Sequence, residues 1–175
     1  MSSQIRIISS MATRQLLSEL VAQYQQTSAQ QIATESVGGV DAAKRVRAGE
    51  AFDAVVLAAN AIDDLIAAGR IVAGSRVDLV RSGVAIAVRA PPGVPVGTLV
   101  ARGEVELGFQ QLSELIHLSG ITVLGPLPPA IQTITTFSAG VASTSTQPEA
   151  VRALLRFMAS PATTEPKLKN GMEPA

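Results

Sequence analysis

The sequence predicts an α/β fold with a parallel or mixed β-sheet that carries helices on both faces. Strand-like and helix-like segments alternate from residue 5 to residue 69, which is the pattern of consecutive β-α-β units with right-handed crossovers. The segment "FDAVVLAA" contains a continuous apolar run, as in strands that are covered on both faces. Hydrophobic residues make up 47% of the chain and charged residues 16%, which is enough apolar material for a globular core.

The elements of the first half follow from short residue patterns. The β-branched run "IRII" and the buried run "AVVLAA" favour strands, whereas an apolar stripe at helical spacing follows each of them. The expected strands are 5–8, 29–37 and 52–59, and the expected helices are 9–26, 41–48 and 61–69. Ser9 or Ser10 is the expected N-cap of the first helix and Asn60 that of the third, because their side chains can accept hydrogen bonds from open N–H groups.

The second half is broken by prolines. Residues 71–90 are expected to form two extended segments, and the prolines of "PPGVPVG" (91–97) predict an extended connector. A strand is expected at 133–141 and a helix at 147–160, where Pro148 stands near the helix start. The polar tail 166–175 is expected to be frayed or loosely docked.

Composition excludes several classes of function. Fourteen basic and fourteen acidic residues cancel, so no overall field favours nucleic acid or an anionic membrane. One Tyr, four Phe and no Trp leave few side chains for stacking on bases. The chain has no Cys, which excludes thiol chemistry, and its one histidine, His117, argues against a His-rich metal site. We expect no cofactor, no metal and no membrane-spanning segment, since no apolar stretch reaches ~18 residues.

Gly38 and Gly39 stand between a predicted strand and a predicted helix. Glycines there let backbone N–H groups approach an oxyanion at a helix N-terminus, where the helix dipole favours negative charge. The alternative is a tight corner that requires positive φ. Asp41 can cap the same helix and compete with an anion. The residues alone leave both interpretations open.

Polar residues also stand at other strand ends. Ser9 and Ser10 can donate hydroxyl hydrogen bonds to a ligand as well as cap a helix. Asn60 can reach a cleft or serve only as a cap. Gln110 and Gln111 end an apolar run, so their amides either line a cleft or lie half-exposed.

Several longer segments, in the same order, resemble a known family. They are "VGGVDAAKRVRAGEAFDAVVLAANAIDDLIAAGRI", "SRVDLVRSGVAIAVRA", "LVARGEVELGFQQLSEL", "GPLPPAIQTITTFSAGVA" and "GMEPA". The chain resembles the molybdate-binding proteins and their relatives, which are type 2 periplasmic solute-binding proteins of ABC transporters. The resemblance implies two α/β lobes with an anion bound at helix N-termini in the cleft between them. It implies a first lobe of residues 1–82, with about 131–175 packing back on it, and a hinge strand with a shortened second lobe at 83–130.

Two departures from the family pattern stand out. Between a strand like "AVRA" and a stretch like "PPGVPVG", members carry a helix, a strand and another helix that are missing here. The second lobe is therefore expected to be truncated and to lack one wall of the cleft, and the surface so exposed predicts a homodimer. The family's molybdate binders have a serine where Gly38 or Gly39 stands and a tyrosine where Gln111 stands, which favours an organic anion as an alternative to molybdate.

The resemblance and the strand ends together predict a set of ligand contacts. They are Ser9, Ser10, Met11, Gly38, Gly39, Val40, Ala59, Asn60, Gln110 and Gln111. The predicted function is a non-enzymatic solute-binding protein of an ABC-type uptake system. Its expected partners are a small anion and a transporter membrane component.

Two alternatives stay open. One is an isomerase of tricarboxylic acids on the same scaffold, with Glu35, Asp41 or Glu114 as candidate bases. The other is a shortened paralogue that binds nothing. The family is periplasmic, whereas "MSSQIRIISS" lacks the apolar core of a signal peptide, so the sequence as written predicts a cytoplasmic location.

Overall fold

The main sheet is mixed rather than wholly parallel. The computed structural model describes residues 4–89, 100, 106–119 and 121–175. Strands β1 (Ile5–Ser10), β2 (Ile32–Val37) and β3 (Ala54–Ala58) are parallel, in the order β2-β1-β3. The sheet continues antiparallel through β7 (Ile134–Val141) and β4 (Val77–Arg89), and the short β8 (Glu173–Pro174) also pairs with β4. The mixed α/β fold class predicted from the sequence is confirmed.

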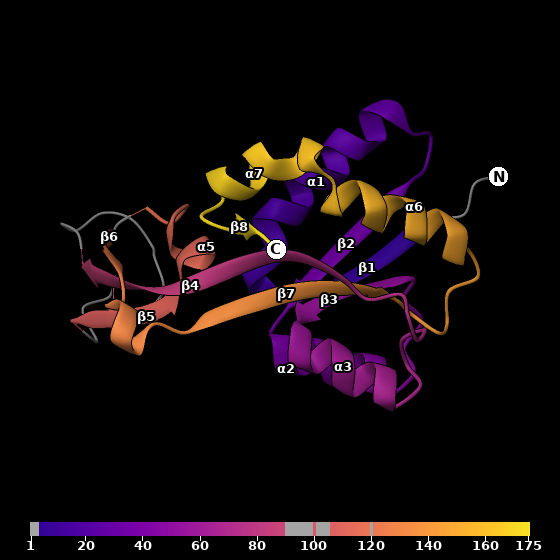
Figure 1. Cartoon of the computed structure of the whole chain (residues 1–175), viewed down its shortest axis with the longest axis horizontal. Helices are drawn as coiled ribbons and strands as arrows, with labels where there is room; N and C mark the ends of the chain where they lie inside the picture. The colour runs from indigo at the N-terminus through magenta and orange to yellow at the C-terminus, as the bar shows by residue number, and fades with distance from the viewer. Residues whose placement is uncertain (1–3, 90–99, 101–105, 120) are drawn as a thin grey trace.

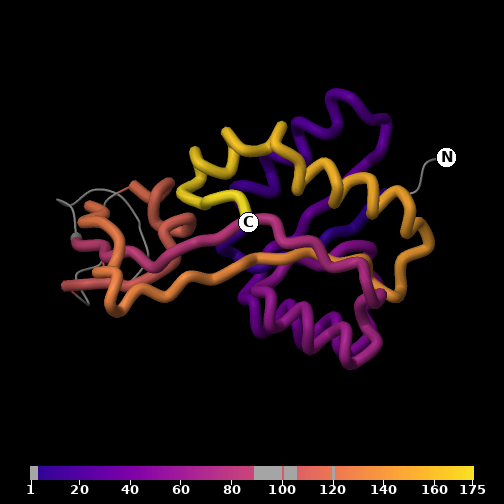
Figure 2. Tube along the Cα trace, in the orientation of Figure 1, coloured from indigo at the N-terminus to yellow at the C-terminus, as the bar shows by residue number. Residues whose placement is uncertain are grey.

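Alternate residues of the central strands point into two separate cores. Ile7 and Val56 belong to one core, whereas Ile8 and Val55 belong to the other, as the two-residue period of a strand requires. Helices α1 (Arg14–Thr27) and α6 (Pro148–Ala159) cover the first face, and α2 (Gly39–Arg47) and α3 (Ala59–Ala67) cover the second. Figures 1 and 2 show these two helical layers on either side of the sheet.

A smaller body extends from the main sheet along β4 and β7, at the left of Figure 1. The outer half of β4 pairs with β5 (Leu107–Gln111) on one side and β6 (Ile121–Pro126) on the other. The one-turn helix α5 (Leu112–Leu115) packs on this sheet through Leu115, against Ala85 and Ala87. Strand β4 is thus shared by both sheets. The division of the chain into lobes at residues 82 and 83 stays a prediction.

The side chain of Gln132 fills the gap where β4 leaves β7. The Val84 N–H donates to Gln132 Oε1 at 2.9 Å, and Gln132 Nε2 donates to the Val84 carbonyl at 3.0 Å. The amide therefore replaces one rung of the strand ladder just beyond the last β4–β7 pair, Gly83 with Ile134. Gln132 itself directly follows η2 (Pro129–Ile131) in the chain. A Cβ atom on Gly83 would lie 3.1 Å from Gln132 Nε2, so this crossing favours glycine.

One face of the small sheet is apolar and exposed. Leu107, Phe109 and Leu124 are 51%, 61% and 60% exposed. Solvent-facing apolar clusters of this kind often mark interaction sites. A homodimer through this face stays a prediction.

Of the two predicted helix caps, Ser10 occupies the N-cap position without a capping bond, whereas the cap assigned to Asn60 is wrong. The first helix opens with η1 (Met11–Thr13), whose N-cap residue Ser10 makes no side-chain capping bond, and α1 then follows Thr13. Helix α3 begins at Ala59, directly after the strand, so Asn60 lies inside the helix and Ala58 occupies the N-cap position. Helix α3 starts at the strand end without an intervening loop, so Asn60 comes too late in the chain to serve as its cap.

Other boundaries also differ from the prediction. Helix α2 starts at Gly39, before the expected residue 41. The two extended segments expected at 71–90 are one long strand that follows a turn at Gly74. The extended connector predicted at 91–97 lies outside the described residues.

The prediction of a frayed tail is wrong. The tail forms η3 (Pro161–Thr163), α7 (Thr164–Lys169) and β8. Its Met172 is buried in the first core, and Asn170 is buried and bonded to the Pro166 carbonyl through its Nδ2. The polar composition of this segment gave the wrong prediction because a polar side chain such as Asn170 can be buried when its amide has hydrogen-bond partners.

Lys167 on α7 gives a stability prediction. Its side chain is 2% exposed and has no ion-pair partner among the described residues, and burial lowers the pKa of its ammonium group. Below the folded-state pKa the lysine is charged in both states, so the full burial cost opposes folding. That cost declines as the pH rises towards the ordinary value of 10.5. Lys167→Met is expected to raise the free energy of unfolding by on the order of 1 kcal/mol at pH 7, and less above pH 10.

The measurement is urea denaturation at both pH values. Lys169→Met is the matched control, because the Lys169 side chain is 65% exposed and only pairs with Glu19. The control is expected to change stability by less than about 0.5 kcal/mol. A Lys167→Met protein less stable than the wild type at pH 7 would contradict the prediction.

Candidate functional site

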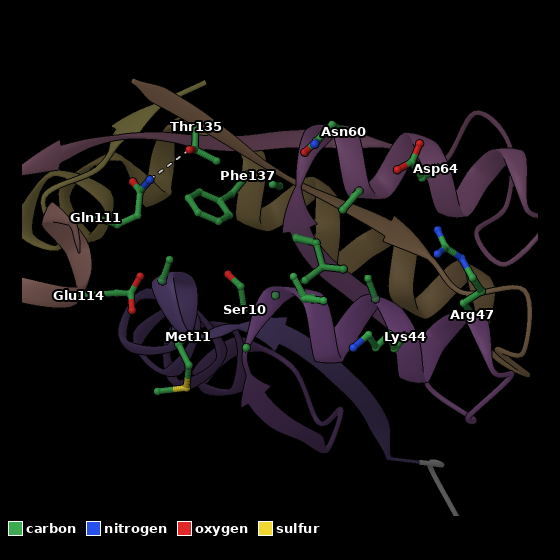
Figure 3. Close-up of a pocket in the computed structure, with 18 residues that line it drawn as sticks. Ser10, Met11, Lys44, Arg47, Asn60, Asp64, Gln111, Glu114, Thr135 and Phe137 are labelled. Carbon is green, nitrogen blue, oxygen red and sulfur yellow. Dashed lines mark hydrogen bonds between the residues drawn. The ribbon is translucent and has the colours of Figure 1, made fainter. Parts of the chain in front are cut away.

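A cavity of about 640 Å³ lies at the carboxyl edge of the parallel strands (Figure 3). Its walls come from the ends of β1, β2 and β3, from the helices that follow them, and from the β5–α5 junction and β7. Parallel strands end at one edge of a sheet, so the helices that follow start around the same point. The cavity therefore lies where the predicted cleft was expected.

Four helix N-caps line this cavity: Ser10 before η1, Gly38 before α2, Ala58 before α3 and Gln111 before α5. None of the four makes a side-chain capping bond. Such bonds are also absent at the other described helices, so what distinguishes these four ends is that they open into one cavity. Open N–H groups and the positive ends of helix dipoles favour an anion there.

The glycine turn is not a strained corner. Gly38 has φ −54°, and the glycines with positive φ in the described residues lie elsewhere, as at Gly49 and Gly69. The interpretation of Gly38 and Gly39 as a positive-φ corner is therefore wrong. A Cβ atom on Gly39 would lie 3.7 Å from the Ser10 Cβ atom, so a side chain there would project beside Ser10. Glycine leaves the start of α2 open to the cavity.

The first amides of α2 are available to a ligand. The first bond within the helix is from the Ala42 N–H to the Gly38 carbonyl, at 2.9 Å. The Gly39 and Val40 N–H groups precede it and have no acceptor within the helix. Asp41 makes no capping bond and its carboxylate is 72% exposed, 4.0 Å from Lys44 Nζ. The expected competition from Asp41 is absent in this arrangement.

Ser10 and Gln111 bring side-chain groups to the cavity. Ser10 is 7% exposed, and its Oγ has no hydrogen-bond partner among the described residues. Gln111 Nε2 donates to Thr135 Oγ1 at 3.1 Å, whereas Gln111 Oε1 is buried without a partner. A buried hydroxyl without a partner is costly unless something else satisfies it, so Ser10 is a candidate donor to a bound anion.

The structure brings most of the predicted contacts together but not all of them. Those that line the cavity are Ser10, Met11, Gly38, Gly39, Val40, Asn60 and Gln111. Ser9, Ala59 and Gln110 do not line it. Ser9 Oγ instead bonds Ser36 Oγ at 2.8 Å, and Gln110 Nε2 donates to Glu114 Oε2 at 2.6 Å. The role of the lining residues as ligand contacts stays a prediction.

The sequence prediction missed several lining residues. They are Lys44, Arg47, Asp64, Thr135 and Phe137. The first two lie one and two helical turns after Val40, so the helical period carried a signal that could have found them. The two β7 residues carried no local signal, because only the long-range crossing of β7 places them at this edge.

Arg45, between the two lining cations of α2, is engaged elsewhere. Its guanidinium donates to Glu35 Oε1 at 2.5 Å and to Glu50 Oε1 at 2.6 Å, and it lies over the Phe52 ring. These bonds lower the pKa of both carboxyl groups. Glu35 is therefore tied to a structural ion pair and is a poor candidate base.

The described residues hold no group of three or more His, Cys, Asp or Glu side chains suited to a metal ion. In the same part of the chain, no helix has both the length and the apolar character needed to cross a membrane.

Comparison with known proteins decides the family. A model of the bacterial extracellular solute-binding proteins matches residues 5–94 and 89–173. The chain belongs to that family. The two matched segments of this solute-binding protein meet at residues 89–94, which is where the sequence predicts a missing segment.

Individual relatives agree with this assignment. An aconitate isomerase from a Pseudomonas sp. is 32% identical over 184 residues, covering 74% of this chain and 70% of the relative. The alignment is longer than the 175-residue chain, so the relative has residues without a counterpart here.

Two solved structures share the fold. The periplasmic molybdate-binding protein of Azotobacter vinelandii has a TM-score of 0.80 at 12% identity, with 96% of this chain and 98% of that chain covered. The sulfate-binding protein SubI of Mycobacterium tuberculosis H37Rv has a TM-score of 0.78 at 15% identity, with 99% and 87% covered. The predicted fold of a type 2 periplasmic binding protein is confirmed.

The two neighbouring serines of β1 give a prediction about the stability of the protein without added anion. Ser9→Ala removes a partly buried hydrogen bond to Ser36 and is expected to lower the free energy of unfolding by about 1 kcal/mol. Ser10→Ala removes a buried, unpaired hydroxyl, so it is expected not to lower the free energy of unfolding. Urea denaturation without added anion measures both values, and the opposite order would show that Ser10 is paired within the protein.

Proposed function

We propose that this solute-binding protein holds a small anion in the cavity, with the negative charge at the N-termini of η1, α2 and α3. The observation that carries the proposal is the meeting of these helix ends with the buried, unpaired Ser10 hydroxyl. Backbone N–H groups, a hydroxyl and helix dipoles can hold an anion without a fully charged partner. In an uptake system the loaded protein would deliver the anion to an ABC-type membrane component.

The lining favours an organic carboxylate over a tetrahedral oxyanion. The lining combines polar donors such as Ser10, Asn60 and Gln111 with the apolar side chains of Met11, Val40, Leu57 and Phe137. An organic carboxylate has both a charged group and apolar carbon atoms, so it suits a lining that offers both donors and apolar surface. A cavity of about 640 Å³ is also of the size that organic ligands occupy.

The proposal is tested by thermal unfolding of the purified chain with added anions. Molybdate, tungstate, sulfate, phosphate, citrate, and cis- and trans-aconitate are added one at a time. A ligand present at 100 times its dissociation constant stabilises the folded state by ~2.7 kcal/mol, so a clear rise in Tm is expected with a carboxylate. A cooperative transition that none of these anions shifts would overturn the proposal.

Gly39 gives a sharper test of the helix N-termini. Gly39→Asp places a carboxylate in the first turn of α2, where it is expected to raise stability without ligand by about 0.3–1 kcal/mol. The same carboxylate occupies the anion position, so binding is expected to fall at least tenfold. Titration calorimetry and urea denaturation measure the two effects, which have opposite signs.

Gly39→Asn is the matched control, since it has the size of aspartate without its charge. It is expected to retain more affinity than Gly39→Asp. Equal affinity in the two variants would mean that only space, and not the helix dipole, matters at this position.

A second candidate function is isomerisation of a tricarboxylic acid, which the 32% identity to an aconitate isomerase favours. The reaction needs a base that takes a proton from a carbon next to the double bond. The proton then returns to the other end of the allylic carbanion, so that the double bond moves. Of the three candidate bases, only Glu114 lines the cavity. Its Oε2 accepts a bond from Gln110, which leaves Oε1 for the substrate.

This candidate is tested by following aconitate in D₂O by proton NMR. Wild-type protein is expected to convert one isomer into the other and to incorporate deuterium. Glu114→Gln is expected to lower that rate by roughly 10²–10⁴-fold while binding is kept. Asp41→Asn, a change at an exposed carboxylate outside the cavity, is the control. A wild type that binds aconitate but leaves it unchanged would remove the isomerase function.

A further inference from the structure

The cavity continues along α2 beyond the helix N-termini. Lys44 and Arg47 line this continuation, and in Figure 3 they follow one another along the helix away from Ser10. With a rise of 1.5 Å per residue, they lie about 7.5 and 12 Å along the axis from Gly39. Helical side chains lean towards the N-terminus, and the Lys44 ammonium points back towards Ser10 in the close-up.

Both cations are available to a ligand. The pair of Lys44 with Asp41 is long, at 4.0 Å, and both side chains are 72% exposed, so a ligand can replace it at small cost. Arg47 is exposed and has no ion pair or hydrogen bond among the described residues. Arg45, by contrast, is committed to Glu35 and Glu50.

Two carboxylates restrict where a second negative charge can lie. Asp64 faces Arg47 across the cavity in Figure 3 but makes no ion pair with it. Its negative charge disfavours an anion at the end of the cavity near Arg47. Glu114 lies at the opposite end, beside Gln111. The most favourable position for a second anion is therefore beside Lys44, between the helix N-termini and Arg47.

We infer that Lys44 and Arg47 form a second anionic subsite and that the ligand is a dicarboxylate or tricarboxylate. One carboxylate lies at the helix N-termini with Ser10, and another reaches Lys44 and Arg47. Val40 and Leu57 also line the cavity and supply apolar surface for the carbon chain between the two carboxylates. This inference rests on the proposed anion-binding function and gives its ligand class.

The size of the cavity supports a ligand with separated charges. A tetrahedral oxyanion fills a space of roughly three water molecules, or about 90 Å³, which is a small part of 640 Å³. Bound at the N-termini, it would leave Lys44 with only its long pair to Asp41 and would leave Arg47 without an ion pair among the described residues. A chain of carbon atoms with a carboxylate at each end uses both positions and the apolar wall between them.

Calorimetric titration with matched carboxylates tests the inference. The probes are butyrate, succinate, glutarate and tricarballylate at constant ionic strength, with molybdate as a compact dianion. The proteins are the wild type, Lys44→Gln, Arg47→Gln and the double variant. Arg156→Gln is the control for net charge, because Arg156 is exposed on α6 across the sheet from the cavity.

In the wild type, at least one of the longer dicarboxylates or tricarballylate is expected to bind more than tenfold more tightly than butyrate. The double variant is expected to lose this preference while its affinity for butyrate stays within about twofold. Arg156→Gln is expected to keep the preference. Because surface charges are screened by salt, the preference should also shrink as the salt concentration rises.

Three outcomes would overturn the inference. The first is a wild type with no preference for a second carboxylate. The second is a double variant that keeps the preference, which would place the second charge elsewhere. The third is an equal loss for butyrate and dicarboxylates, which would show a general field effect. Binding of butyrate or molybdate in any of these cases leaves the proposed anion-binding function standing, whereas binding of none of the probes overturns both.

Discussion

The parallel pairing of β1, β2 and β3 is the constraint on which the rest of the molecule depends. Parallel strands in register end at one edge of the sheet, and here each passes directly into a helix. The N-termini of η1, α2 and α3 must then meet at that edge. Their N-cap residues are Ser10, Gly38 and Ala58, and two of these have no side chain that could satisfy the open N–H groups. Local sequence and global topology thus act together to concentrate positive potential at one point.

Much of this arrangement was predictable because it follows from local patterns. The strand and helix order, the two-sided core and the position of Gly38 and Gly39 at a helix start all follow from periodicity and from the special properties of glycine. Glycine is suited both to a corner with positive φ and to an open helix start. Only the φ angle of Gly38 in the structure decides between the two. The cap assigned to Asn60 failed because the chain turns from strand to helix without a loop.

Other parts of the site could not come from the sequence because they depend on distant contacts. Thr135 and Phe137 reach the cavity only because β7 lies antiparallel beside β3 and β4. The docked tail depends on partners elsewhere: Asn170 bonds His117 on one side at 2.7 Å and Glu19 on the other at 3.3 Å. Lys44 and Arg47 are an intermediate case. Helical spacing could have placed both on the same face of α2 as Val40. It could not show that Arg45, between them, is paired with Glu35 and Glu50 instead of lining the cavity.

The way β4 is divided between two sheets has a consequence for how such proteins diversify. Its inner half, up to Gly83, pairs with β7 and β8, whereas its outer half from Val84 pairs with β5 and β6. The two family segments meet at 89–94, where β4 ends with the pair of Arg89 and Ile121. Residues can be added or removed after this pair without breaking any rung between β1, β2 and β3, and the entropic cost of a longer connection grows only slowly. Evolution, or an engineer grafting a reporter, can therefore change the length of the chain next to the small sheet while the strand edge that lines the cavity is kept.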